Sequence, residues 1–389
     1  MTHSVDHHRP ASSPLDPVEV AAAMLTCLPE MTPARLHELI ERWDDPIGAL
    51  HAVRRGLAGA VLCARARPDD LPARIALAKL WQHDAHDDDR VARLLATRGT
   101  RVYVAGRDGY PIDEVPHPPP VLLAEGIDER ALGRPRVAVV GTRAATPHGL
   151  ADAREIGAVL AGAGVCVVSG LAIGIDAAAH EGALDAGGSV IGVVATGLDV
   201  VYPRRHRALF DRVRGSGLLV SETGYGVQPR RGAFPVRNRI IAGLADVVVV
   251  VEATLKGGAR ITAERAVDYG RPVMAVPGSR RNPAAAGTNE LLRDGASPCI
   301  DPSDILLALG LTPGSRRRNH REPARGDAAA VLRACGGEPA TFDQIASRTA
   351  LAPAAVVSAV RELERAGWME RSKGLCWPRA ASDPPARAR

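Results

Sequence analysis

Several features that would point to particular classes of protein are scarce or absent in this sequence. Six cysteines stand at positions 27, 63, 166, 299, 335 and 376, with no Cys-x-x-Cys pair. This scatter argues against zinc ribbons and disulfide-rich scaffolds and fits a reducing cytosol. No apolar run is long enough to span a bilayer, and the start does not resemble a signal peptide. We therefore expect a cytoplasmic protein with no membrane partner.

Aromatic residues and lysines are also few. Aromatics make up 3% of the chain, so any stacking on nucleotide bases must use few rings. Lysine occurs only at positions 79, 256 and 373, so nearly every cation is an arginine, which can fork onto phosphate and stack on bases. The net charge of +5 favours an anionic partner. Residues 204–239 contain nine arginines against Asp211 and Glu222, a local charge of +7.

The 389 residues suggest two or three domains. Residues 1–16 are polar, and we expect a disordered tail. Residues 17–98 show apolar residues at helical spacing, broken by prolines, and predict a small helical domain. The core is expected over 99–310 and a basic linker over 311–326. Three helical stretches followed by two short strands predict a winged helix over 327–380, before a tail at 381–389.

The core alternates apolar blocks with helical stretches. The expected strands are Val137–Val140, Val165–Val168, Val190–Ala195, Leu218–Val220, Val247–Val251 and Val273–Val276. Continuous valine and isoleucine blocks are typical of parallel strands buried on both faces. Their alternation with helices predicts right-handed crossovers and an α/β, doubly wound, mostly parallel sheet. An earlier strand is expected at 101–105, before a proline-rich crossing at 116–120.

The residues that follow each strand are suited to ligand binding, because open parallel sheets bind ligands beyond the carboxyl ends of their strands. Gly141, Thr142 and Arg143 follow the first strand, where Gly141 would let the backbone approach a ligand and the others would hold an anion. No Gly-x-Gly-x-x-Gly motif follows, so a dinucleotide is not supported, and we expect neither a cofactor nor a metal.

The later strand ends repeat this pattern. The second strand leads into Ser169, Gly170 and Gly174, and then Asp176 and His180 are interpreted as a helix cap and a packing residue. The remaining candidates are cations, rings and small residues that follow the third and later strands: Tyr202, Arg204, Arg205, Phe234, Arg237, Asn238, Arg239, Lys256, Gly257 and Gly258.

Over residues 134–300 the chain resembles the DNA-processing protein A family, known as DprA or Smf. The matching motifs are Val-Gly-Thr-Arg at 140–143, Ser-Gly-Leu-Ala-x-Gly-Ile-Asp-x-Ala-Ala-His at 169–180, Gly-Leu-Asp-x-x-Tyr-Pro at 197–203, Ser-Glu at 221–222, Phe-Pro-x-Arg-Asn-Arg-Ile-Ile-Ala-Gly at 234–243 and Ala-Val-Pro-Gly at 275–278.

The resemblance implies an extended Rossmann-like fold. It also implies a non-catalytic homodimer that binds single-stranded DNA without strong sequence preference and hands the strand to the RecA recombinase during natural transformation. By motif position it makes Arg143 the first expected DNA contact and puts Arg204 or Arg205 at a second. The same groove is expected to be lined by Arg237, Asn238, Arg239 and Lys256.

This sequence departs from the family pattern at several places. Ile173 stands where the family often has a polar or basic residue, and the loop 256–260 reads Lys-Gly-Gly-Ala-Arg instead of the commoner Lys-Ser-Gly-Ser-Leu. The N-terminal helices lack the hairpin glycines that would clasp a DNA backbone.

Two other functions remain open. Residues 257–264 partly match the Gly-Gly-x-Gly-Thr-x-x-Glu loop of nucleotide-hydrolysing phosphoribohydrolases, but Arg260 and Ile261 occupy the Gly-Thr positions. The winged helix, with Arg348, Arg361 and Arg365, could instead be a sequence-specific DNA reader. Glu362 and Glu364 dilute its charge and favour an auxiliary or protein-binding role.

Overall fold

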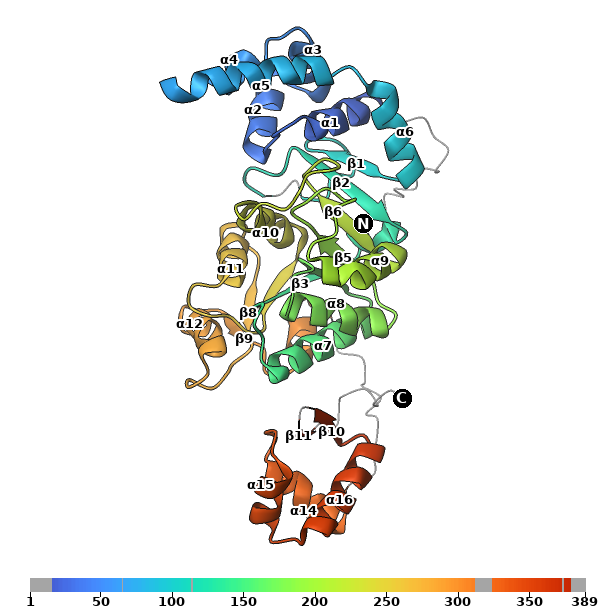
Figure 1. Ribbon diagram of the computed structural model, residues 1–389, viewed down its shortest axis with the longest axis vertical. Helices are drawn as coiled ribbons and strands as arrows, with labels where there is room; N and C mark the ends of the chain where they lie inside the picture. The colour runs from blue at the N-terminus through green and yellow to red at the C-terminus, as the bar shows by residue number, and fades with distance from the viewer. Residues whose placement is uncertain (1–15, 65, 113–114, 312–323, 373, 379–389) are drawn as a thin grey trace. The chain divides into compact units, whose positions relative to one another are not determined.

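The computed structural model describes residues 16–64, 66–112, 115–311, 324–372 and 374–378. The expected tails, residue 16 apart, and most of the expected linker lie outside these residues. The chain divides into two compact units between residues 313 and 314, and each is described by itself (Figure 1). In the described residues, no helix has the length and apolar character needed to cross a bilayer.

The first unit begins with six α-helices. They are α1 (Pro17–Cys27), α2 (Pro33–Trp43), α3 (Pro46–Arg54), α4 (Gly59–Cys63), α5 (Leu71–Asp84) and α6 (Asp88–Arg98). Pro33 and Pro46 begin helices here because proline at the first helical position gives up an amide that has no partner inside the helix. Before them, the side chains of Thr32 and Asp45 accept hydrogen bonds from free amides of the first turn.

A nine-stranded sheet follows. Its strands are β1 (Arg101–Val104), β2 (Val121–Gly126), β3 (Arg136–Val140), β4 (Cys166–Ser169), β5 (Val190–Val193), β6 (Leu218–Ser221), β7 (Val247–Val250), β8 (Val273–Ala275) and β9 (Ser297–Pro298). The spatial order is β1-β2-β6-β5-β4-β3-β7-β8-β9. Strands β3 to β9 pair in parallel, while β2 pairs antiparallel with β1 and β6. The predicted six parallel strands are confirmed, but β2 was not expected from the sequence.

Helices cover both faces of the sheet, so the fold is the expected doubly wound one. One face is covered by α7 (Pro147–Gly162), α8 (Ile175–Asp185) and α9 (Arg207–Ser216). The other face is covered by α10 (Ala233–Leu244) and α11 (Gly258–Asp268). Along β3, Val137 and Val139 enter the core under α7 and α8, whereas Ala138 and Val140 enter the core under α10 and α11. Burial on both faces explains the continuous valine runs. The shorter α12 (Ala286–Arg293) and α13 (Ser303–Ala308) complete this unit.

The sheet order reverses between β3 and β7, because the chain builds β4, β5 and β6 on one side of β3 and β7, β8 and β9 on the other. Doubly wound sheets bind ligands in a crevice beyond the carboxyl ends of strands near such a switch point. In this chain, the crevice is the region above the carboxyl ends of β3, β4 and β5.

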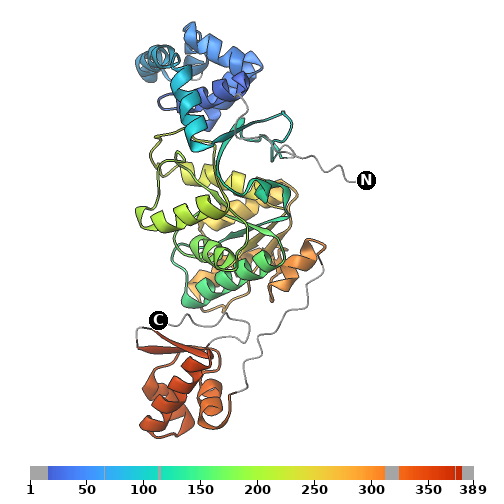
Figure 2. The same ribbon diagram turned by 90° about the vertical axis from the view of Figure 1, so that its right-hand side faces the viewer.

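The N-terminal helices share a core with this sheet. Leu25 and Leu28 at the end of α1 belong to the same buried cluster as Val102 and Val104 of β1. Both views show the helices continuing directly onto the first strands (Figure 1 and Figure 2). The expected domains 17–98 and 99–310 are thus joined by one continuous apolar core.

The second unit is the expected winged helix. It contains α14 (Gly326–Cys335), α15 (Phe342–Thr349), α16 (Pro353–Arg365) and the antiparallel hairpin of β10 (Met369–Ser372) and β11 (Leu375–Pro378). Thr341 and Gln344 form a capping box at the start of α15. Val331, Ile345 and Val360 are fully buried in a core that is separate from those of the first unit.

Candidate nucleic-acid interface

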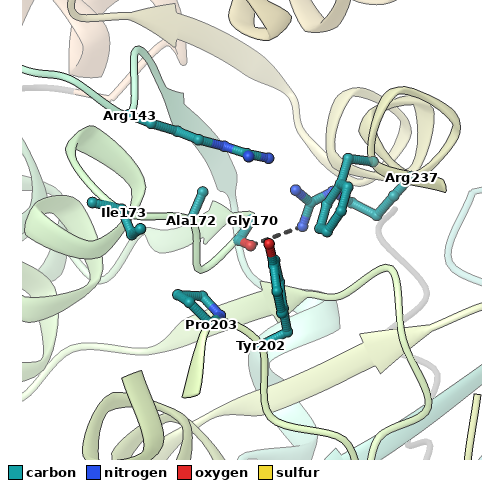
Figure 3. A pocket seen from close by; sticks show the side chains of 8 residues that line it. Arg143, Gly170, Ala172, Ile173, Tyr202, Pro203 and Arg237 are labelled. Atoms are coloured by element: carbon teal, nitrogen blue, oxygen red, sulfur yellow. Dashed lines mark hydrogen bonds between the residues drawn. The ribbon is translucent and has the colours of Figure 1, made fainter. Parts of the chain in front are cut away.

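A small hollow opens above the carboxyl ends of β3, β4 and β5 (Figure 3). Its volume is about 40 Å³, and its lining comes from three strand-end loops and the first turns of α10: Arg143, Gly170, Ala172, Ile173, Tyr202, Pro203, Phe234 and Arg237. We call this hollow the notch, and the edge of a ligand could rest against it.

Arg143 and two aromatic rings form the exposed part of this notch. The guanidinium carbon of Arg143 lies 5.1 Å from the centre of the Phe234 ring, a cation–π distance. The Phe234 and Tyr202 rings lie 5.4 Å apart at an interplanar angle of 39°. Arg143 is exposed and Tyr202 keeps 42% of its surface accessible. The arrangement offers a positive charge for phosphate and ring faces for bases.

Arg237 lies on the inner wall of the same notch and is buried. Its Nη1 donates to the carbonyl oxygens of Gly170, at 2.8 Å, and Val193, and its Nε donates to Asn238. Burial lowers the pKa of Arg237 to about 10, with Asp176 opposing the shift and Arg143 adding to it. The side chain remains positive at neutral pH, and its Nη1 holds the β4 and β5 ends together.

Asp176 and His180 belong to the supporting structure. Asp176 accepts hydrogen bonds from the amides of Gly170 (3.1 Å) and Ala172 (3.4 Å). It lies inside α8, whose cap position is Gly174, so the interpretation of Asp176 as the cap is wrong. Burial raises the pKa of Asp176, opposed chiefly by Arg237. His180 packs as predicted, bonded to the Ile191 carbonyl, and burial lowers its pKa to about 4.

Four predicted residues turn out to serve the internal geometry of the crevice. A side chain at Gly141 would meet Ile175 and the Glu252 carbonyl closer than 3.0 Å, so internal packing already requires a glycine there, without any approach of a ligand. At Gly170, a Cβ would lie 2.5 Å from the Arg237 guanidinium. Gly174 has φ +90°, which favours glycine. Ser169 is fully buried and donates to the Val139 carbonyl at 2.6 Å.

Thr142, Arg204 and Arg205 are close to lining residues in the sequence but do not themselves line the notch. The Thr142 amide donates to the Glu252 carbonyl at 2.7 Å, and its hydroxyl accepts from the Ala144 amide at 3.2 Å. Arg204 and Arg205 form an exposed turn directly after Pro203. Neither has an ion-pair partner among the described residues.

The remaining predicted cation of α10 is committed to an ion pair. Arg239 pairs with the carboxylate of Glu222, and the two side chains are 18% and 6% exposed. Burial raises the pKa of Glu222 to about 7, although the nearby Arg239 charge pulls it down. Arg239 therefore faces a buried carboxylate and does not line the notch.

Lys256 and Gly257 line a second hollow, whereas Asn238 and Gly258 do not. Asn238 donates to the Gly258 carbonyl at 3.1 Å and so joins α10 to α11. Lys256 and Gly257 line an open hollow of about 350 Å³, together with Leu255, Arg260, Ile261, Glu264 and Glu290. This hollow contains the loop that was compared with phosphoribohydrolases. Its Arg260 is paired with Glu290, and Glu264 is exposed on α11.

The dense arginine run of 204–239 is partly neutralised. Arg212 pairs with Asp185, Arg214 with Glu125 and Arg239 with Glu222, while Arg237 is buried. Five arginines of the run stay exposed and have no ion-pair partner among the described residues: Arg204, Arg205, Arg207, Arg230 and Arg231. The prediction of individual site residues omitted Arg230 and Arg231, although the charge count had included them.

Comparison with known proteins agrees with the motifs. The family model for DNA recombination-mediator protein A matches residues 101–310, and a model for the DprA winged helix domain matches residues 317–374. A Mycobacterium tuberculosis protein assigned as DNA processing protein DprA is 38% identical over 391 residues, covering 92% of this chain and 94% of that protein.

The DNA processing protein DprA of Streptococcus pneumoniae is 43% identical over 203 residues, covering 51% of this chain and 71% of that protein. The X-ray structure of DprA from the same organism matches with a TM-score of 0.60 and 31% identity, over 76% of this chain and 98% of that chain. Motifs, fold and matched length together show that this chain belongs to the DNA processing protein A (DprA/Smf) family.

Proposed function

We propose that this protein binds single-stranded DNA, without catalysis, along the crevice above β3, β4 and β5. The observation that carries the proposal is the cluster of exposed Arg143 and Tyr202 around the half-buried Phe234 ring, with exposed Arg204 and Arg205 on the adjacent turn. Binding of single strands without sequence preference uses such a combination, because cations follow the phosphates while every base offers a face to stack on a ring.

The polar groups in the floor of the crevice support a binding role over a catalytic one. Asp176 is held by two backbone amides, Arg237 by two backbone carbonyls, and His180 is buried and neutral at physiological pH because its pKa is about 4. A general acid or base needs a pKa near the working pH and a path to its substrate. These three groups instead stabilise the positions of the strand ends.

The proposal extends to the setting in which the strand is used. A homodimer of this chain would act in the cytoplasm and deliver bound single strands to the RecA recombinase. Membership of the DNA processing protein A family supports this extension, because DNA processing is the activity for which its members are named.

The binding step can be tested by fluorescence anisotropy with labelled oligothymidylate. We expect tight, salt-dependent binding by the wild type and strong loss with Arg143→Ala. Arg93→Ala removes another exposed arginine side chain, from α6, and should bind like the wild type. Equal affinities of Arg143→Ala and wild type would refute the assignment of this crevice.

Two further measurements address the other parts of the proposal. Incubation with nucleoside monophosphates should release no free base; release would favour the hydrolase alternative. Delivery would be measured as the rate of RecA filament formation on the same strand, which the wild type should raise and Arg143→Ala should not.

A further inference from the structure

The loop between β3 and α7 carries Arg143, and a single residue beyond the end of β7, Glu252, holds both ends of this loop. At its start, the Thr142 amide donates to the main-chain carbonyl of Glu252 at 2.7 Å. At its end, the Thr146 amide donates to Oε2 of Glu252 at 2.8 Å, and the Thr146 hydroxyl donates to Oε1 at 2.6 Å. Three oxygens of one residue therefore fix the loop 142–146.

Glu252 is also packed against the first turn of α7. The residue is 7% exposed, and a Cβ at Gly149 would lie 2.4 Å from its carboxylate. Thr146 is the N-cap of α7, and its hydroxyl accepts from the Gly149 amide at 3.1 Å while it donates to Glu252. A negative charge is favoured beside a helix N-terminus by the helix dipole. The same carboxylate therefore holds the end of the loop and the start of the helix.

The position of this carboxylate decides which groups are left for a ligand phosphate. Doubly wound sheets that bind nucleotides hold a phosphate at the N-terminus of the helix after the first parallel strand, which is α7 in this chain. Here the Thr142 amide and both polar groups of Thr146 donate to Glu252 instead. An internal anion thus takes the place of the phosphate, and the side chain of Arg143 is left as the cation of this loop.

Arg143 stands between the two ends that Glu252 holds. Its exposed side chain extends from the loop toward the wall formed by Arg237 (Figure 3), and its guanidinium carbon lies 5.1 Å from the centre of the Phe234 ring. Because the side chain itself is exposed, its direction depends on the main chain beneath it. A cation on a fixed main chain loses less conformational freedom when it binds, so it binds a phosphate more tightly.

We propose that Glu252 is a positioning residue for DNA binding, which holds the loop 142–146 so that Arg143 meets a phosphate from a fixed place beside the Phe234 ring. The inference rests on the proposed function and deepens it, because it names a buried acidic residue that acts through Arg143. Thr146 transmits the effect, since its amide and hydroxyl join the carboxylate to the loop. Removing either side chain should therefore weaken DNA binding only while Arg143 is present.

A double-mutant cycle tests this dependence on Arg143. Affinities for labelled oligothymidylate would be measured by anisotropy for Glu252→Ala and Thr146→Val, each alone and each combined with Arg143→Ala. Glu252→Gln is the conservative variant, because it keeps an acceptor for the Thr146 amide. The matched control is Thr32→Val, which removes the N-cap hydroxyl of α2 in the same unit. Melting temperatures of all variants would be recorded alongside.

With Arg143 present, Glu252→Ala and Thr146→Val should each weaken DNA binding by about 3- to 10-fold, the usual effect of one neutral hydrogen bond. In the Arg143→Ala background, the same changes should have little effect, because the side chain that they position is gone. Glu252→Gln should bind more tightly than Glu252→Ala. Thr32→Val should bind like the wild type, although its melting temperature should fall about as much as that of Thr146→Val.

Equal losses of affinity with and without Arg143 would overturn this inference, because they would show a general effect on the fold. Wild-type affinity in both single variants, or equal affinities of Glu252→Gln and Glu252→Ala, would overturn it as well. If Glu252→Ala does not fold, the Thr146→Val cycle decides the question. In each of these cases, loss of binding in Arg143→Ala would leave the proposed function intact, whereas wild-type affinity of Arg143→Ala would overturn the proposed function itself.

Discussion

Replacing Arg237 by methionine tests whether this arginine is a structural residue or a DNA contact. Its motif position places it with the DNA-binding residues, yet its guanidinium is buried and donates to the Gly170 and Val193 carbonyls. Methionine keeps much of the length of the side chain and removes the charge and the donors. The two carbonyls lose their partner, and the buried Asp176 loses the charge that stabilises its carboxylate.

The magnitude follows from these contacts. Removing one partner from a buried, charge-stabilised group costs about 3–5 kcal/mol. For a unit of this size, each kcal/mol lowers the melting temperature by about 2–4 °C, so we expect a decrease of about 10 °C. Arg143→Ala removes an exposed side chain and should change the stability by less than about 0.5 kcal/mol. Arg143→Ala should also weaken DNA binding by about 1.5–3 kcal/mol, or about 10- to 150-fold, which is the usual value for a hydrogen bond to a charged group.

Thermal unfolding followed by circular dichroism would be combined with anisotropy titrations at a temperature where both variants are folded. We expect Arg237→Met to lose stability and Arg143→Ala to lose affinity. The reasoning fails if Arg237→Met melts like the wild type and still loses DNA binding, because that result would make Arg237 a direct contact.

Three further predictions concern the Phe234 ring, the contact of Gly224 with Thr26 and the buried Glu222. Phe234→Ala should weaken binding by about 1–3 kcal/mol through lost stacking, and anisotropy should show that Phe234→Tyr retains it. Gly224→Ala forces a Cβ against the Thr26 carbonyl and should lower stability by about 1–3 kcal/mol; an unchanged melting temperature would contradict the packing described here. Because the pKa of Glu222 is raised from 4.5 to about 7, its contribution to stability is present below pH 4.5 and is lost as the pH rises through 7. The free energy of unfolding of the wild type should therefore fall by up to about 3 kcal/mol between pH 5 and pH 8, and its melting temperature should fall with it, whereas Glu222→Gln should lack this component.

The parallel strands could be predicted because burial on both faces leaves a direct trace in the sequence. In β7, all four residues are buried valines, and no amphipathic helix shows such a run. Strand β2 was missed for the opposite reason. It follows a proline-rich segment and is defined by pairing with β6, about 100 residues away, and with β1. Its buried Glu125 also argues against a strand when only the sequence is considered. In the structure, Tyr225, Arg98 and Arg214 surround this carboxylate and stabilise it.

The sequence predicted that the strand-end loops would lie together, but it could not predict the direction of each side chain. The strand-end loops of β3, β4 and β5 do meet at one notch, as expected for a parallel sheet. On α10, however, Arg237 lies on the same face as Ile240, Ile241 and Leu244, which are all buried. The spacing i, i+3, i+4 and i+7 marks the core face of a helix and was the available signal that Arg237 points inward. The pairing of Arg239 with Glu222 depends on tertiary contacts and left no comparable signal.

The apolar contact between α1 and β1 has a practical consequence for anyone who shortens this protein. A fragment cut at residue 101, where the family match begins, would remove Leu25 and Leu28 from Val102 and Val104 and expose these apolar side chains of β1 to solvent. Such a fragment should self-associate, and this self-association could be mistaken for a defect in DNA binding. A cut after residue 311 separates two independently packed cores and should leave the crevice undisturbed.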